Sequence, residues 1–391
     1  MKKLWIVGVV MLLLMACAQA APASTGMGGR AMGMGGAFTA VADDGTAAYW
    51  NPAGLTQVRF GLTPTLGAIG DWNEFSDLQD KIEKFEEIGS FTELENLEIK
   101  KAGMMVNLGA GINFSHFAFN LFFDPNIHTG GLNANNGELD GNVPLMASFS
   151  FAREFTDLFG VGVNIKGAVL GRGVANYKTE SIMLDIEGKE VPLKAPNGEV
   201  KYGTGMGYLL DVGGLFKVSD RVRVGAVLRN ISLGGIELEG ERSSTNIKYL
   251  QDKIQEYKEQ GMSTDEAIER LEREINEGHV DVLLTTEDHT ETYKLPTVLA
   301  LGGALKLPVM GTLIAADYEI PFSDEEESSF HLGVEQPILG IIFLRVGGFT
   351  ADDDVRFTAG LGGKLGPVLL DLAAVQGEDS TGVFLTGGFR F

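Results

Sequence analysis

The feature that most constrains the fold is a repeated alternation of apolar with polar or small side chains. It recurs in segments of about ten residues, such as RVRVGAVLRN (221–230), VRFTAGLGGK (355–364), GVGVNIKGAV (160–169) and SFHLGVEQ (329–336). Successive side chains of a β-strand point to opposite faces, so each segment predicts a strand with one apolar and one wet face. Such strands occur in soluble sandwiches, where the apolar face is the core, and in membrane barrels, where it faces lipid.

The end of the chain favours the membrane barrel. In VFLTGGFRF (383–391), Val383, Leu385 and Phe389 share one face, and the alternation runs to the final Phe391. A soluble domain seldom ends in so apolar a strand. The segment resembles the C-terminal recognition signal of bacterial outer-membrane barrels, which implies that the barrel-assembly machinery is a partner through Phe391.

The number and spacing of these segments support the same fold. Fourteen segments fit the pattern, an even number, as single-chain bacterial barrels require. They are 58–69, 102–113, 115–124, 143–152, 158–172, 204–217, 221–232, 293–307, 310–320, 329–337, 339–349, 355–366, 367–376 and 382–391. Tight turns alternate with longer polar connections at 70–101, 125–142, 173–203, 233–292, 321–328, 350–354 and 377–381. We therefore predict an all-β, 14-stranded antiparallel transmembrane β-barrel with short inner turns and long outer loops.

Two of the outer loops carry helical patterns. Apolar residues recur at helical spacing near 74–98, and two further stripes occur near 246–277. In the second loop, Ser263 and Glu266 form a predicted capping box at the start of a helix. The expected helical hairpin at the barrel mouth is either a lid that captures substrate or a solvated insertion held by its own apolar stripes.

The N-terminus predicts export. Lys2 and Lys3 precede an apolar run over 4–15, and Ala18-Gln19-Ala20 is a small-x-small cleavage site, so residues 1–20 are a predicted signal peptide. Lipidation at Cys17 is the alternative. Cys17 is the only cysteine, so we expect neither disulfides nor thiol catalysis in the mature chain.

Charge and composition argue against several classes of function. The formal net charge of −22 argues against nucleic acid as a partner. Histidines are scattered singly, and His289 in EDHTE (287–291) fits a solvated acidic loop better than a metal site. The acidic runs 323–329 and 351–355 could collect divalent cations shared with lipopolysaccharide, although solvation is the simpler interpretation. We therefore predict no enzyme activity, no cofactor and no resident metal.

Many charged residues fall on the inward face of the predicted strands. The inward cations include Lys166, Lys306, Lys364, Arg221, Arg223, Arg229, Arg345, Arg356 and Arg390, mixed with Asp211, Asp317, Glu319, Glu335 and Asp371. So basic an interior needs counter-charges, from ion pairs across the lumen or with a plug inside it. An anion path is the alternative, and we favour the ion pairs.

One stretch identifies a family. GRAMGMGGAFTAVADDGTAAYWNPAGL (29–55) resembles the start of the FadL/TodX outer-membrane transporters for long-chain fatty acids and other hydrophobic compounds. The resemblance implies a barrel over 58–391, whose N-terminal segment 21–57 folds inward as a hatch. It assigns gating positions to Gly35, Gly36, Asp43, Asp44, Asn51, Pro52, Ala53 and Gly54. Trp50 would fill space there or meet the ligand.

The resemblance also sets the expected function. It implies passive uptake of a hydrophobic small molecule through the bacterial outer membrane, with lipid and lipopolysaccharide around the barrel and sideways release of the substrate. PorV/PorQ components of a secretion system and TraF-like proteins share similar openings. The alternative is therefore a PorV-like barrel that binds a protein in secretion or surface assembly.

Overall fold

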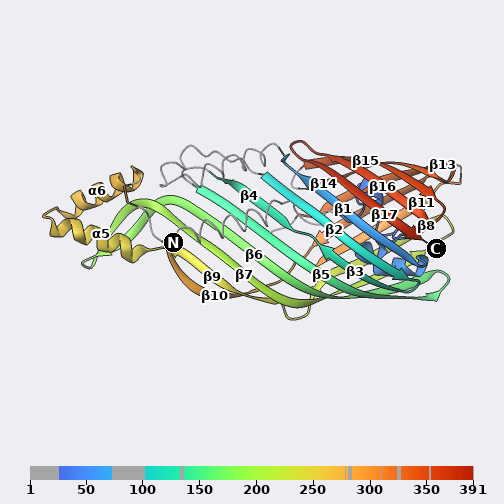
Figure 1. Ribbon diagram of the computed structural model, residues 1–391, viewed down its shortest axis with the longest axis horizontal. Helices are drawn as coiled ribbons and strands as arrows, with labels where there is room; N and C mark the ends of the chain where they lie inside the picture. Colours follow the sequence, from blue (N-terminus) through green and yellow to red (C-terminus); the bar gives the residue numbers. More distant parts are fainter. Residues whose placement is uncertain are drawn as a thin grey trace.

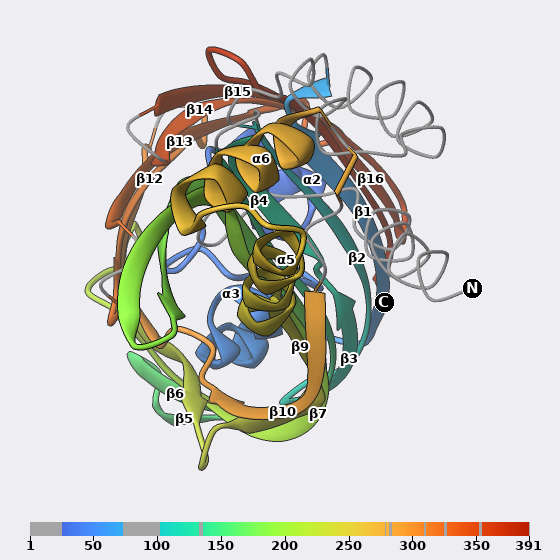
Figure 2. The ribbon, with the colours of Figure 1, turned by 90° about the vertical axis from the view of Figure 1, so that its left-hand side faces the viewer.

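A computed structural model describes residues 26–72, 102–132, 136–277, 279–280, 284–308, 310–323, 327–351 and 354–390. They form a closed antiparallel barrel of fourteen strands, closed by pairing of β17 (Thr381–Arg390) with β1 (Gly61–Gly70) (Figures 1 and 2). The predicted fold class and strand number are therefore confirmed. The predicted signal peptide, the helical loop at 74–98 and Phe391 lie outside the described residues.

Three barrel strands are interrupted, so that the wall contains seventeen shorter strands. The interrupted pairs are β3 (Phe117–Phe123) with β4 (Asn126–Leu132), β8 (Val222–Ser232) with β9 (Ile236–Thr245), and β10 (Leu284–Tyr293) with β11 (Val298–Lys306). The others are β2 (Ala102–Phe114), β5 (Asn136–Thr156), β6 (Phe159–Ile186), β7 (Lys189–Lys217), β12 (Leu313–Pro321), β13 (Ser329–Ile338), β14 (Ile342–Ala351), β15 (Asp354–Leu365) and β16 (Val368–Gln376).

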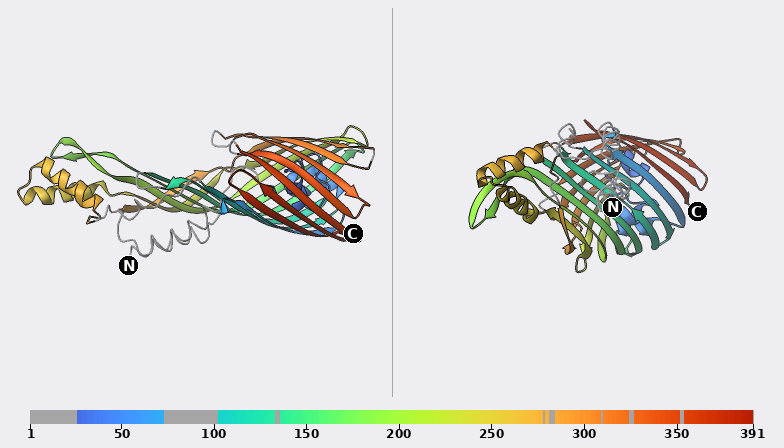
Figure 3. Two further views of the ribbon diagram at one scale, coloured as in Figure 1. Left: turned by 90° about the horizontal axis from the view of Figure 1, so that it is seen from above. Right: turned by 60° about the vertical axis from the view of Figure 1, so that its left-hand side comes forward.

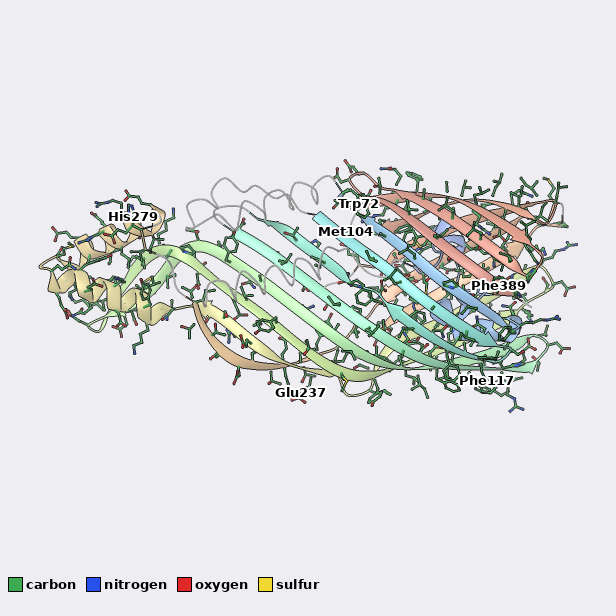
Figure 4. The ribbon with its side chains drawn as sticks, in the orientation of Figure 1. Trp72, Met104, Phe117, Glu237, His279 and Phe389 are labelled. Atoms are coloured by element: carbon green, nitrogen blue, oxygen red, sulfur yellow. The ribbon has the colours of Figure 1, made fainter. Side chains whose placement is uncertain are left out.

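The two faces of the wall separate as the alternation predicts. On β6, Ile165 is 54% exposed on the outer face, whereas the neighbouring Asn164 and Lys166 are buried on the inner face. Phe117 and Phe389 likewise lie on the outer surface of the barrel (Figure 4). An apolar outer face and a polar inner face suit a barrel that lipid surrounds.

The wall is much taller on one side than on the other. The strands β12 to β17 have 9 to 12 residues, whereas β6 has 28 and β7 has 29. A tilted strand needs about 9–11 residues to cross a bilayer. The outer parts of β5, β6 and β7, together with β4, β9 and β10, therefore continue far beyond the rim of the shorter wall (Figures 1 and 3). We call this part the one-sided extension.

The extension corrects three sequence predictions. The connections expected at 125–142 and 173–203 are mostly strand, with only a tight turn near Gly188 between β6 and β7, and 233–292 begins and ends as the strands β9 and β10. These stretches were predicted as loops because polar residues occupy both faces of the strand there. Paired neighbouring strands satisfy the backbone, so no apolar face is needed outside lipid.

A helical hairpin forms the far tip of the extension (Figures 1 and 3). The helices α5 (Ile247–Glu259) and α6 (Thr264–Asn276) bury their apolar stripes against the β6–β7 tip, with Leu250 and Leu271 on the helices and Leu184 on the strands fully buried. The predicted hairpin is confirmed, and we call it the helical head. Among the described residues, no helix is long and apolar enough to cross a membrane.

Local hydrogen bonds fix the helical head. The capping box predicted at the start of α6 is present: Glu266 N–H donates to the Ser263 hydroxyl oxygen, and Ser263 N–H donates to the Glu266 carboxylate. Later in α6, Glu274 accepts hydrogen bonds from the Tyr257 hydroxyl and from Arg270 Nε (2.7 Å), and these two donors lower the pKa of its carboxyl.

We expect Ser263→Ala to loosen the helical head without affecting the barrel, because it removes the side-chain acceptor of the cap. A lost N-cap costs about 1 kcal/mol, so amide exchange over 264–276 should become about fivefold faster by hydrogen-exchange mass spectrometry. Ser263→Thr keeps the hydroxyl and serves as the control. Equal exchange in the alanine variant and the wild type would show that strand packing alone holds α6.

Candidate functional site

The N-terminal segment occupies the inside of the barrel at the end away from the helical head (Figures 1 and 2). It contains α2 (Gly29–Gly33), α3 (Ala47–Trp50) and the 3₁₀-helix η1 (Pro52–Gln57), and we call residues 26–58 the plug. Trp50 is at its centre, almost fully buried, and its Nε1 donates to the Met27 carbonyl oxygen (2.9 Å). Phe38 and Tyr49 pack edge-on against the Trp50 ring, so Trp50 fills space within the plug.

Two glycines bring the plug backbone against the wall. Gly35 and Gly36 have φ of 64° and 78°, and a Cβ on Gly35 would lie 2.6 Å from the backbone of Gly348. A Cβ on Gly36 would lie 2.8 Å from His331 Nδ1. His331 Nδ1–H donates to the Gly35 carbonyl oxygen (2.7 Å), because a carbonyl oxygen can only accept. Only glycine fits both the left-handed backbone and the close approach.

The Asn-Pro-Ala-Gly stretch fastens the far side of the plug. Asn51 Nδ2 donates to the Thr39 carbonyl within the plug (3.0 Å) and to the Gly214 carbonyl on β7 (3.1 Å). Its Oδ1 accepts from Ala53 N–H (3.1 Å), and Pro52 begins η1 at the position where a missing N–H costs nothing. A Cβ on Gly54 would lie 2.0 Å from the backbone of Ala42, so this turn is tightly packed inside the plug.

A chain of buried and partly buried ion pairs links the plug to the wall. Arg30 of the plug pairs with Asp43 of the plug (2.6 Å) and with Glu335 on β13 (2.8 Å). The same Glu335 pairs with Arg345 on β14 (2.7 Å), which pairs with Asp371 on β16 (2.7 Å). Each charge has an opposite charge at contact distance, as burial requires. We call these five residues the charge chain.

The remaining predicted plug residues reinforce this contact. Asp44 lies 3.4 Å from Arg30 and accepts a hydrogen bond from Thr46 N–H (2.8 Å). On the wall, Arg223 donates to the Gln57 side chain (2.6 Å), and Arg390 donates to the Asp43 carbonyl (3.2 Å). Of the predicted lumen-facing arginines, Arg223, Arg345 and Arg390 therefore meet the plug or the charge chain.

The other predicted inward cations are placed differently. Arg229 is buried beside Glu319, and Arg356 is buried 3.6 Å from Asp354. Arg221 lies in the turn before β8 and is exposed. Lys306 and Lys364 are also exposed near the ends of their strands. The alternation of apolar and polar residues continues past the end of the wall. A residue there can have the position of an inward side chain in the alternation and still be exposed to solvent.

Polar side chains on the inner faces of β6 and β7 lie beside the plug on one side of the lumen, and we call them the polar layer. Along the inner face of β6, Asn164 Nδ2 donates to the plug carbonyl of Ala48 (2.6 Å), and Lys166 pairs with Asp211 on β7 (2.7 Å). All three wall side chains are buried. Buried ions and hydrogen bonds occupy this side of the lumen, which makes it unfavourable for an apolar molecule.

Beyond the polar layer, the inner face becomes apolar. On β6 the inward residues after Lys166 are Ala168 and Leu170, and neighbouring strands place apolar side chains beside them. We call this set the apolar cluster: Met27, Phe122, Met146, Ala168, Leu170, Leu209, Ile236 and Leu238, with Tyr49, Tyr293 and Leu295 partly buried against it. Met27 and Tyr49 belong to the plug, so the cluster lies directly against the plug.

Charged residues return on the mouth side of the apolar cluster. Arg172 pairs with Asp140 (2.6 Å) and lies over the Tyr293 ring at 4.5 Å. Arg172, Lys201, His289 and Leu238 line a small hollow here. His289, predicted in a solvated loop, lies instead on β10 beside Glu291.

The sequence contains a signal for the apolar cluster that the inside–outside alternation alone did not reveal. In IKGAVLGRG (165–173), Ala168, Val169 and Leu170 are consecutive, so both faces of the strand are apolar at this point. Elsewhere in the strand, Asn164, Lys166 and Arg172 make the inner face polar. A break in alternation therefore marks the level where the lumen is lined with apolar side chains.

Known proteins share this fold although their sequences differ. No family model matches the chain, and no curated protein matches it. The structure of the toluene transporter TbuX of Ralstonia pickettii is similar with 14% identity and a TM-score of 0.59, over 94% of this chain and 98% of TbuX. A FadL homologue of Pseudomonas aeruginosa has 12% identity and a TM-score of 0.61, over 95% of this chain and 100% of the homologue. The CymD monoaromatic hydrocarbon channel has 13% identity and a TM-score of 0.58, over 94% of this chain and 98% of CymD. The fold expected from the FadL/TodX resemblance is confirmed.

We expect Arg30→Met to loosen the plug, because it leaves Asp43 without its closest cation and removes the link to Glu335. Removing one partner of a fully buried pair costs about 3 kcal/mol, and solvent screening lowers this cost for the partly exposed Arg30 and Asp43. Ion conductance of the purified barrel in planar bilayers should rise above the wild-type level. Arg221→Met removes an exposed arginine and should leave the conductance unchanged. Equal conductance in all three proteins would show that the charge chain does not hold the plug.

Deletion of residues 26–55 is the larger perturbation of the same contact. We expect large, open conductance steps, because the deletion removes most of the plug from the lumen. Circular dichroism should still show a folded barrel. Unchanged conductance in a folded deletion variant would mean that this segment does not obstruct the lumen.

Proposed function

We propose that this chain is a bacterial outer-membrane channel for the passive uptake of hydrophobic compounds. The observation that carries the proposal is the apolar cluster inside the lumen, on the mouth side of the plug. Apolar side chains in a barrel interior have no role in contact with lipid. A cluster of them beside the plug therefore favours an apolar ligand.

The similar structures agree with this proposal. Their names describe a toluene transporter, a monoaromatic hydrocarbon channel and a FadL homologue, which are channels rather than enzymes. We propose hydrophobic small molecules as the substrates of this chain, with long-chain fatty acids as one candidate class. Catalysis is not part of the proposal.

The layers of the lumen suggest a mechanism. A molecule would be captured at the extracellular mouth, pass the ion-paired level around Arg172, and settle in the apolar cluster. Met27 and Met146 contribute flexible, polarizable side chains that can adapt to ligands of different shape. The plug and the polar layer would meanwhile keep ions and water from passing straight through the barrel. The gating role of Gly35, Gly36, Asp43, Asp44 and Asn51–Gly54 would consist of holding this plug in place.

The second candidate is a PorV-like barrel that binds a protein. The helical head favours this alternative, because it presents a packed, charged surface at the far tip of the extension. Purification from detergent followed by mass spectrometry separates the two functions. Bound fatty acids or hydrocarbons would support uptake, and a stoichiometric protein partner with no bound lipid would overturn it.

The apolar cluster gives a direct test with a matched pair of variants. Leu170 points into the cluster, and the adjacent Val169 points outward and is 47% exposed. Leu170→Trp replaces the leucine side chain with a bulky indole ring that fills the proposed ligand space. We therefore expect it to weaken binding of N-phenyl-1-naphthylamine about tenfold, or 1.4 kcal/mol. Equilibrium dialysis with the purified protein measures this apolar dye.

Val169→Trp adds the same ring on the lipid side and should bind the dye like the wild type. Equal binding in both variants, or no binding by the wild type, would contradict a ligand site in the apolar cluster.

A further inference from the structure

One carboxylate of the inner face borders the apolar cluster. Asp124 directly follows β3, two residues after Phe122 of the cluster, so both side chains point to the same face of the strand. Asp124 N–H donates to the Pro144 carbonyl oxygen on β5 (3.2 Å), and Pro144 lies opposite Leu170 of the cluster on β6. The carboxylate of Asp124 is therefore at the same level of the barrel as Leu170.

Asn107 on the neighbouring strand β2 contacts this carboxylate. The Asn107 side chain is fully buried, and its Nδ2 donates a long hydrogen bond to Asp124 Oδ1 (3.4 Å). The Oδ1 of Asn107 is also buried and has no hydrogen-bond partner among the residues that the structure describes. Amide and carboxylate oxygens only accept hydrogen bonds. This border of the apolar cluster therefore offers acceptors and lacks donors.

Asp124 also lacks a cation of its own. Lys166 pairs with Asp211 (2.7 Å), and Arg172 pairs with Asp140 (2.6 Å). Within the described part of the chain, no basic side chain forms an ion pair with Asp124, and the bond from Asn107 is the one that its carboxylate accepts. Asp124 is only partly buried, so its carboxylate stays accessible from the lumen.

This arrangement favours one kind of polar group on a ligand. A hydroxyl group attached to an apolar body can donate to Asp124, and a hydrogen bond to a charged acceptor is stronger than one between neutral groups. A carboxylate on the same body would instead meet a like charge at close range, which is unfavourable where water is scarce.

The cations on the mouth side do not reverse this preference. A ligand carboxylate would need a basic side chain that is not already neutralised. Each of the three basic side chains that line the hollow there has a carboxylate beside it: Arg172 has Asp140, Lys201 has Glu199, and His289 has Glu291.

We infer that Asp124 is a specificity residue, which makes the channel select apolar compounds that carry a hydroxyl group over those that carry a carboxylate. The inference rests on the proposed function and narrows its substrate class to alcohols and phenols with an apolar body. The apolar cluster holds that body, and Asp124 accepts the hydrogen bond from the hydroxyl group.

Three naphthalenes of similar shape test this preference. 2-Naphthol carries a hydroxyl group, 2-methoxynaphthalene carries the same oxygen without its proton, and 2-naphthoate carries a carboxylate. Equilibrium dialysis with the purified protein, corrected for uptake by detergent micelles alone, gives the three affinities. We expect the wild type to bind 2-naphthol most tightly and 2-naphthoate most weakly.

Two variants of Asp124 separate its oxygens from its charge. Asp124→Leu removes both, so binding of 2-naphthol should weaken about tenfold, as expected for a lost hydrogen bond to a charged group. Binding of 2-methoxynaphthalene should stay within about twofold, because this compound has no proton to donate. Asp124→Asn keeps one acceptor oxygen and the size of the side chain. It should retain most of the affinity for 2-naphthol and bind 2-naphthoate more tightly than the wild type does.

Three results would overturn the specificity role: tight binding of 2-naphthoate by the wild type, an unchanged preference for 2-naphthol in folded Asp124→Leu, or unchanged binding of 2-naphthoate by Asp124→Asn. Circular dichroism shows whether each variant is folded. Failure of the wild type to bind any of the three naphthalenes would instead overturn the proposed function.

Discussion

The whole structure depends on closure of the ladder between the first and the last barrel strand. Pairing of β1 with β17 leaves no open edge in the barrel, so the wall satisfies its own backbone groups and can present an apolar surface to lipid. Period-two alternation then makes the interior polar. A polar interior needs counter-charges, and the plug supplies them through Arg30 and Asp43. The plug is thus a consequence of the wall as well as an obstacle inside it.

The sequence predicted those features for which one local pattern has one structural meaning. The alternation around Ile165 and Lys166 placed both side chains correctly, and the spacing of Ser263 and Glu266 located the start of α6. The stretch 29–55 pointed to the inside of the barrel through resemblance. The fold could be predicted although sequence identity with the similar structures is low, because many different sequences give the same alternation of apolar and polar residues.

Other features depend on partners that a single segment does not contain. The outer parts of β6 and β7 are strands because each supplies the other with hydrogen bonds, although neither has an apolar face there. In the alternation, Arg221 has the position of an inward-facing residue. Whether the wall encloses a lumen at that position depends on the height of the wall, which the local sequence does not give. Between Ser232 and Glu239, β8 and β9 together run two residues longer than the opposite part of β7, and this excess is visible only when the register of the strands is known.

The wall is taller on one side than on the other, so the two sides of the barrel mouth differ. Over β12 to β17 the rim is low, whereas β6 and β7 rise as a screen on the opposite side. In the proposed uptake, a molecule dissolved at the bilayer surface would enter over the low rim without first leaving that surface for bulk water. Large particles that approach from above meet the screen and the helical head before they reach the lumen. In the proposed uptake, the mouth would thus select by direction of approach before any pocket selects by shape.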